Sequence, residues 1–210
     1  MERQPLWTRN FTILTLGTVV SMLGNAISGF ALSLLILDYT GSTLLYAIFM
    51  VVYNLPKIIM PSIAGPYLDR FSRTKAIWTL DYLSAALYLV IFFLLRGGLF
   101  NYALLLGLCI VIGTIDSVYL VAYDSLYPML ISEGNYAKAY SISSMIYPLS
   151  ALMVPIASWC YEHVGLTPLF LFNAATFAIA ATFETQIRVK ETNLIPFPVI
   201  RMTSSRASPI

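Results

Sequence analysis

The feature of this sequence that most limits its fold is the length of its uncharged stretches. Between Arg9 and Asp38 lie 28 residues without a charged side chain. Further uncharged stretches cover residues 39–56, 82–95, 97–115, 139–161 and 164–183. A helix that crosses a bilayer needs about 20 mostly apolar residues. The pattern therefore predicts six membrane spans, at about 11–37, 43–66, 76–95, 100–122, 139–161 and 166–185.

The composition supports a membrane protein. Only 10% of the residues are charged, whereas a soluble domain has about 25%. Within lipid, only helices and closed barrels satisfy every backbone polar group. The apolar runs here are continuous, whereas barrel strands alternate between apolar and polar residues. We therefore expect an all-α integral membrane fold with six transmembrane helices.

The basic residues predict the orientation of the chain. Six spans place the two termini and the connections near residues 70 and 130 on one side. That side collects ten basic residues and the other only Arg96, and by the positive-inside rule the basic side is cytoplasmic. Both termini are then cytoplasmic, with a bundle over 1–186 and a flexible tail over 187–210. The ten are Arg3, Arg9, Arg70, Arg73, Lys75, Lys138, Arg188, Lys190, Arg201 and Arg206.

Several classes of function have no signature in this chain. It has no phosphate-binding Gly-x-x-x-x-Gly-Lys loop and no metal-spaced His and Cys set. The two cysteines fall inside apolar runs, where small packing residues are common. The net charge of +2 is too small to indicate a nucleic-acid partner. We expect no enzyme activity, no cofactor and no metal.

One short turn carries an unusual share of the charge. In AGPYLDRFSRTKA, residues 64–76, Asp69, Arg70, Arg73 and Lys75 fall within seven residues. Asp69 and Arg73 are four apart and pair if the turn is helical. Gly65 permits close approach of another backbone. The alternative is a basic loop whose only role is to fix the orientation of the hairpin, because its sequence would show the same charges.

This turn resembles the loop between the second and third helices of the major facilitator superfamily. The matching pattern is Gly65-x-x-x-Asp69-Arg70-x-x-Arg73-x-Lys75. LDYTGS at 37–42, LP at 55–56 and YPMLISEGNYAKA at 127–139 resemble the branch of macrolide efflux and siderophore export proteins. The resemblance covers residues 7–186.

The resemblance implies a secondary transporter that rocks two six-helix halves, each a 3+3 inverted repeat. Asp69 and Arg73 would latch the two halves on the cytoplasmic side, with Arg70 in the same motif and Gly65 as the point of close packing. The family has twelve or more helices, and six are predicted here. Span five also has no glycine, unlike the helix five of many drug–proton antiporters in the family.

Two ionisable residues lie deep within the predicted spans. Lys57 is roughly 21 Å from the outer end of its span and Asp116 roughly 24 Å, at 1.5 Å per residue. Such residues are functional candidates by default, and similar depths allow an ion pair. Alternatively, Lys57 extends toward the cytoplasmic surface.

Polar residues on neighbouring faces suggest a cavity. Asp116, Tyr119 and Tyr123 share one helical face, and Thr18, Ser21 and Asn25 form a stripe in span one. The resemblance places spans one and four beside the transport path, so Asn25 and Asp116 are the best candidates for substrate binding or ion coupling. The alternative is that the stripe bonds helices together. For Asp81 we expect a structural role, and for Glu184 a solvated or paired position near the inner surface.

We therefore expect the first half of a major facilitator-type exporter of drug-like or siderophore-like molecules, in a bacterial inner membrane. Its partners would be the lipid bilayer, a small-molecule substrate, and either a second six-helix half or another copy of this chain. The isolated monomer is not expected to transport. The alternative is a non-transporting six-helix scaffold or partner subunit.

Overall fold

The computed structural model describes residues 5–68, 71–99 and 101–189. Within these residues the chain forms seven α-helices and one short 3-10 helix, and no strand. They are α1 (Arg9–Thr40), α2 (Thr43–Leu68), α3 (Arg73–Arg96), α4 (Tyr102–Leu126), η1 (Tyr127–Leu130), α5 (Tyr136–Ala151), α6 (Met153–Val164) and α7 (Thr167–Glu184).

The described residues form six segments that are long and apolar enough to cross a membrane, which confirms the predicted all-helical fold. Helices α1, α2, α3 and α7 are four of them. The fourth span joins α4 to η1, and the fifth joins α5 to α6. The fifth is interrupted at Leu152, because Pro155 has no N–H to donate to the carbonyl of Ala151.

Local sequence signals explain where the helices begin and end. Thr8 caps α1 by accepting a hydrogen bond from the backbone N–H of Phe11. Asn101 caps α4 in the same way. Ser72 caps α3 by accepting from Lys75. Gly41 ends α1 with a φ of 58°, a left-handed conformation that glycine adopts without strain.

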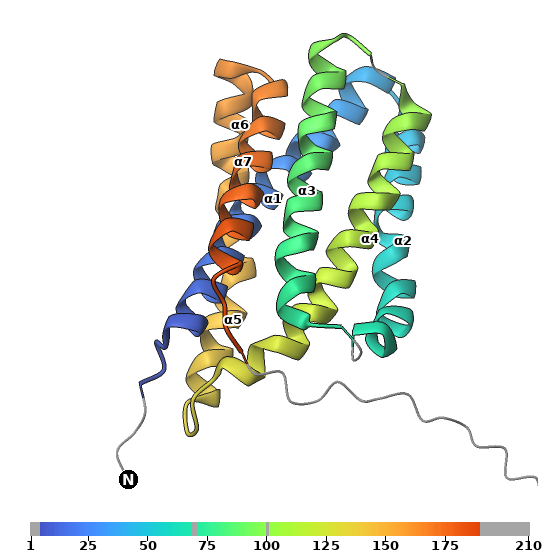
Figure 1. Ribbon diagram of the computed structural model, residues 1–210. Coiled ribbons are helices and arrows are strands. Elements are labelled where there is room, and N and C mark those ends of the chain that lie inside the picture. Colours follow the sequence, from blue (N-terminus) through green and yellow to red (C-terminus); the bar gives the residue numbers. More distant parts are fainter. Residues whose placement is uncertain (1–4, 69–70, 100, 190–210) are drawn as a thin grey trace, which may run out of the picture.

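The helices are not equally enclosed. Helix α7 packs closely against both α3 and α1, while α2 packs mainly against α4 (Figure 1). Helices α5 and α6 lie against α1. Half of the most apolar stretch of α7 is buried, compared with 11% for α2 and 11% for the fifth span. Helix α2 and the α5–α6 span are therefore the least covered of the six spans.

Two apolar clusters divide the interior along the helices. The first includes Ile27 of α1, Tyr88 of α3 and Phe177 of α7. The second includes Leu14 of α1 and Ile77 of α3, together with the last turns of α4. In α1 and α3, buried polar side chains fall between the two clusters: Thr15, Thr18, Ser21, Asp81 and Ser84. A polar layer thus lies inside the apolar bundle.

The beginning of α1 and the end of α7 meet at one end of the bundle. The side-chain amide of Asn10 donates to the backbone carbonyl of Arg188 at 2.8 Å. Ile187 is buried against the second apolar cluster. The first residues of the predicted tail therefore contact the bundle, and residues 190–210 lie outside the described part of the chain. The cytoplasmic location of this end stays a prediction.

Candidate functional site

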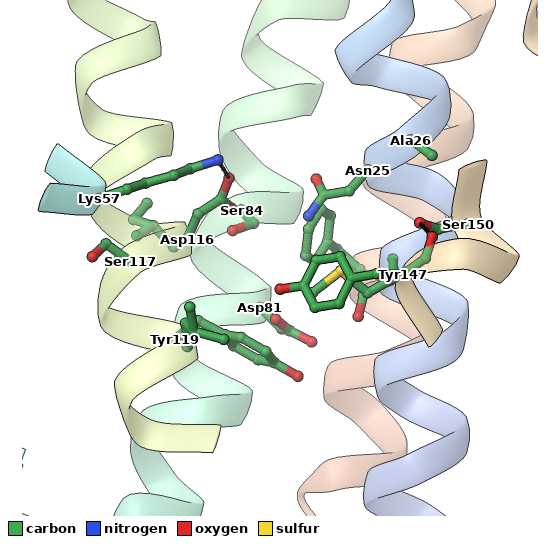
Figure 2. A pocket seen from close by; sticks show the side chains of 15 residues that line it. Asn25, Ala26, Lys57, Asp81, Ser84, Asp116, Ser117, Tyr119, Tyr147 and Ser150 are labelled. Carbon is green, nitrogen blue, oxygen red and sulfur yellow. Dashed lines mark hydrogen bonds and ion pairs between the residues drawn. The ribbon is translucent and has the colours of Figure 1, made fainter. Parts of the chain in front are cut away.

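A cavity of about 270 Å³ opens in the polar layer. Helices α1, α2, α3, α4, α5 and α7 all contribute to its wall. Figure 2 shows Lys57 and Asp116 on one side of it, Asn25 and Tyr147 on the other, and Asp81 between them. Charged and hydroxyl groups thus surround a space within helices that are otherwise apolar. Such a concave site with few polar groups is typical of small-molecule binding.

Lys57 and Asp116 form an ion pair across α2 and α4. The ammonium nitrogen of Lys57 lies 4.0 Å from Oδ2 of Asp116. The same oxygen accepts a hydrogen bond from the hydroxyl of Tyr53 at 2.9 Å. The Lys57 nitrogen also lies 4.3 Å from the centre of the Tyr53 ring, which allows a cation–π interaction. The ion pair that the similar depths allowed is therefore present, and the Lys57 ammonium group is directed to Asp116.

Close packing brings these groups together. A Cβ atom at Gly113 would overlap the backbone carbonyl of Tyr53. Only glycine therefore lets α4 approach α2 so closely at this point. Asp116 follows Gly113 by three residues, so both face α2. The glycine thereby places the carboxylate beside Tyr53 and Lys57.

Asn25 lines the cavity and is also bonded to a neighbouring helix. The hydroxyl of Tyr88 donates to its side-chain oxygen at 3.4 Å. Nearby, the amide of Asn173 donates to the hydroxyl of Ser28 at 2.6 Å. Thr18 and Tyr119 share a hydrogen bond at 3.4 Å. The polar stripe of α1 therefore does hold helices together, and Asn25 additionally faces the cavity.

Tyr119 and Tyr123 stack along one face of α4. Their ring centres are 6.4 Å apart, and Tyr123 and Tyr127 follow at 5.1 Å. Tyr119 lines the main cavity. Tyr123 instead lines a smaller pocket of about 70 Å³, where its hydroxyl lies 3.4 Å from that of Ser143. The structure thus brings Asn25, Lys57, Asp116 and Tyr119 to one cavity, with Tyr123 one turn away from it.

The charged turn is only partly described. Asp69 and Arg70 lie outside the described residues, so their pairing and latch role stay predictions. Arg73 begins α3, and its guanidinium lies 3.3 Å from the sulfur of Met129. A Cβ atom at Gly65 would meet nothing within 4 Å among the described residues. Any close packing at Gly65 would have to involve another part of the protein.

Two buried acids were not predicted as site residues. Asp81 is 1% exposed, yet it lines the cavity. Glu184 is fully buried rather than solvated, and its carboxyl group interacts with that of Asp81. Glu184 follows the last uncharged run of the sequence, a position typical of a helix end at the membrane surface. The two acids are 103 residues apart in the sequence, and no sequence pattern indicated their contact.

Comparisons with known proteins agree with the fold. The family model of the Major Facilitator Superfamily matches residues 14–196. A curated protein of Bacillus subtilis (strain 168), described as "Uncharacterized MFS-type transporter YkuC", is 26% identical over 183 residues. That match covers 86% of this chain and 42% of the relative, so the chain spans less than half the relative's length. Because the family model covers most of the chain, this multi-pass membrane protein belongs to the major facilitator superfamily.

Proposed function

We propose that this chain is the first six-helix half of a secondary transporter that exports drug-like or siderophore-like small molecules across a bacterial inner membrane. Membership of the family supports transmembrane transport. The observation that carries the proposal is the Lys57–Asp116 pair, which opens onto the 270 Å³ cavity. Intramembrane charges of this kind mark substrate or ion pathways.

Asp116 is the proposed coupling residue. Its carboxylate is held by Lys57 and by the Tyr53 hydroxyl, and its side chain is only 16% exposed. A proton or a substrate cation that reaches Asp116 would compete with Lys57 for the same charge. Asn25 and Tyr119 would contact the substrate from the facing helices. Gly65, Asp69, Arg70 and Arg73 would form the cytoplasmic contact with the second half.

The uncovered faces of α2 and of the α5–α6 span support the need for a partner. Large apolar side chains such as Ile58, Met145 and Leu152 are more than 60% exposed there. We propose that a second six-helix half covers part of this surface and completes the transport path. A homodimer of this chain is the alternative arrangement.

Dye accumulation in cells tests the proposal. We expect energy-dependent exclusion of some members of a fluorescent dye panel when the chain is co-expressed with the unmatched part of the Bacillus subtilis relative. An uncoupler and Asp116→Asn should each abolish it, whereas Asp124→Asn, at an exposed carboxyl on the same helix, should not. Equal accumulation in every case would argue for the scaffold alternative. Exclusion by this chain alone would favour a homodimer.

A further inference from the structure

Two carboxyl groups meet inside the bundle at the packing interface of α3 and α7. Asp81 belongs to α3, and Glu184 is the last residue of α7. Their exposed fractions are 1% and 0%. Each side chain lies within hydrogen-bonding reach of the other. The two helices are among the most closely packed in the bundle.

The neighbouring helices enclose this pair. On α1, a Cβ atom at Gly17 would lie 2.8 Å from Oε1 of Glu184, so the glycine leaves the space that the carboxyl group fills. On α4, the hydroxyl of Tyr119 lies near Glu184, but its hydrogen bond is with Thr18. Asp116, also on α4, interacts electrostatically with Asp81 from across the cavity. The facing titratable groups are therefore a tyrosine and another acid.

No cation among the described residues neutralises the pair. Both carboxyl oxygens of Glu184, and Oδ2 of Asp81, are buried without a hydrogen-bond donor in the described part of the chain. Lys57 points to Asp116 and is engaged there. Two ionised carboxylates in such a place would repel each other and would each lose their hydration.

Protonation of one carboxyl group would remove this repulsion. When one carboxyl group is protonated, it becomes a hydrogen-bond donor to the other, and the net charge of the pair falls to one. Carboxyl groups that share a proton are known from enzyme sites where two acids adjoin. We propose that Asp81 and Glu184 form a buried proton-binding site, in which a shared proton holds α7 against α3. The proton comes from water and returns to it through the cavity, which Asp81 lines.

This site is separate from the Lys57–Asp116 pair and does not depend on the proposed transport activity. Loss of the shared proton would leave two negative charges between α3 and α7 and would loosen their packing. The change of stability with pH depends on how many protons the folded and unfolded chains bind. In the unfolded chain both acids ionise freely above mildly acidic pH, so a fold that must keep a proton loses stability as the pH rises.

Infrared spectroscopy of the purified full chain in lipid nanodiscs tests the proposal. We expect a carboxylic-acid C=O band at neutral pH that shifts in D₂O and disappears at alkaline pH. The double variant Asp81→Asn/Glu184→Gln, whose amides imitate neutral acids, should lose this band. Asp116→Asn and Asp124→Asn should keep it. Absence of the band from the wild-type protein at neutral pH, or its persistence in the double variant, would overturn the proposal.

Thermal unfolding gives a second readout. The melting temperature of the wild-type protein should fall as the pH rises from mildly acidic to alkaline. The double amide variant should lose most of that dependence. If the double variant does not fold, the infrared titration of the wild-type protein still decides the question. A wild-type melting temperature that rises over this range would contradict the shared proton.

Discussion

Two helix interfaces of the bundle contain acidic side chains within the membrane-spanning segments. The partners of the acids differ between the two interfaces. The paired-charge interface joins α2 to α4 and contains Tyr53, Lys57, Gly113 and Asp116. The acid interface joins α3 and α1 to α7 and contains Gly17, Asp81 and Glu184. In both, a glycine makes space for close packing. In the described part of the chain, only the paired-charge interface supplies a cation and a hydroxyl donor to its acid.

The difference shows that an acidic residue in an apolar span can be accommodated in more than one way. Asp116 has a cation and a hydroxyl donor beside it, because both Lys57 and Tyr53 contact its carboxyl group. Asp81 and Glu184 lack such partners among the described residues, and the proposed shared proton would take that place. The first arrangement suits exchange with a ligand, and the second suits control of helix packing.

Removing the cation should make the paired-charge interface resemble the acid interface. We expect Lys57→Met to destabilise the fold by about 2 kcal/mol, less than the full cost of breaking a buried pair, because the Lys57 side chain is 40% exposed. Asp116 should then gain a carboxylic-acid infrared band. Thermal unfolding and infrared spectra of the purified variant would measure both effects.

The matched control for Lys57→Met also removes the acid. Lys57→Met/Asp116→Leu leaves no uncompensated charge, so it should recover most of the lost stability. If the double variant is as unstable as Lys57→Met alone, the instability comes from lost packing of the lysine chain and not from Asp116.

Adding one methyl group at Gly113 should disturb the paired-charge interface. The new Cβ atom would overlap the backbone carbonyl of Tyr53, which cannot rotate away. We expect Gly113→Ala to cost about 1–3 kcal/mol in the free energy of unfolding. Gly107→Ala is the control on the same helix, because its Cβ would meet nothing within 4 Å. Equal melting temperatures for the two variants would show that α2 and α4 are less tightly packed than described.

The same change at Gly24, where α1 contacts α7, should have a smaller effect. The new Cβ atom would meet the side chains of Thr176 and Asn173 rather than backbone. We expect Gly24→Ala to cost about 1 kcal/mol, mostly from the disturbed Asn173–Ser28 hydrogen bond. Gly29→Ala on the same helix has no neighbour to displace and serves as the control. A cost at Gly24 that exceeds the cost at Gly113 would reverse the expected order.

The smallest effect concerns a single hydrogen bond near the cavity. Tyr88→Phe removes the donor to Asn25, a long bond of 3.4 Å. We expect a loss of about 0.5 kcal/mol, measured by thermal unfolding. A loss several times larger would mean that Asn25 acts mainly as a structural residue and would weaken its assignment to substrate binding.

The sequence predicted most of the fold because membrane spans follow from composition. The lengths of the uncharged stretches were enough to locate all six spans. The similar depths of Lys57 and Asp116 indicated only that an ion pair was possible, and the structure contains it. The break at Leu152 was not predicted, although Pro148 and Pro155 were visible, because proline does not by itself tell whether a helix bends or stops.

The acid interface could not be predicted, because it depends on which helix faces which. Asp81 and Glu184 come from different spans, and their contact exists only once α7 packs on α3. The same holds for Gly17 and Gly113, whose roles depend on the atoms of another helix. The charged turn was recognised by its motif, but Asp69 and Arg70 lie outside the described residues, so its proposed latch awaits a test.

Dye binding to the purified full chain tests the central claim most directly, because it needs no second half. The claim is that the cavity beside Lys57 and Asp116 is the ligand site. We predict saturable binding of a dye from the panel, weakened about tenfold or more in Asp116→Asn, which corresponds to about 1.4 kcal/mol. Asp124→Asn should bind as the wild-type protein does. Unchanged affinity in Asp116→Asn, or equal loss in both variants, would contradict the account.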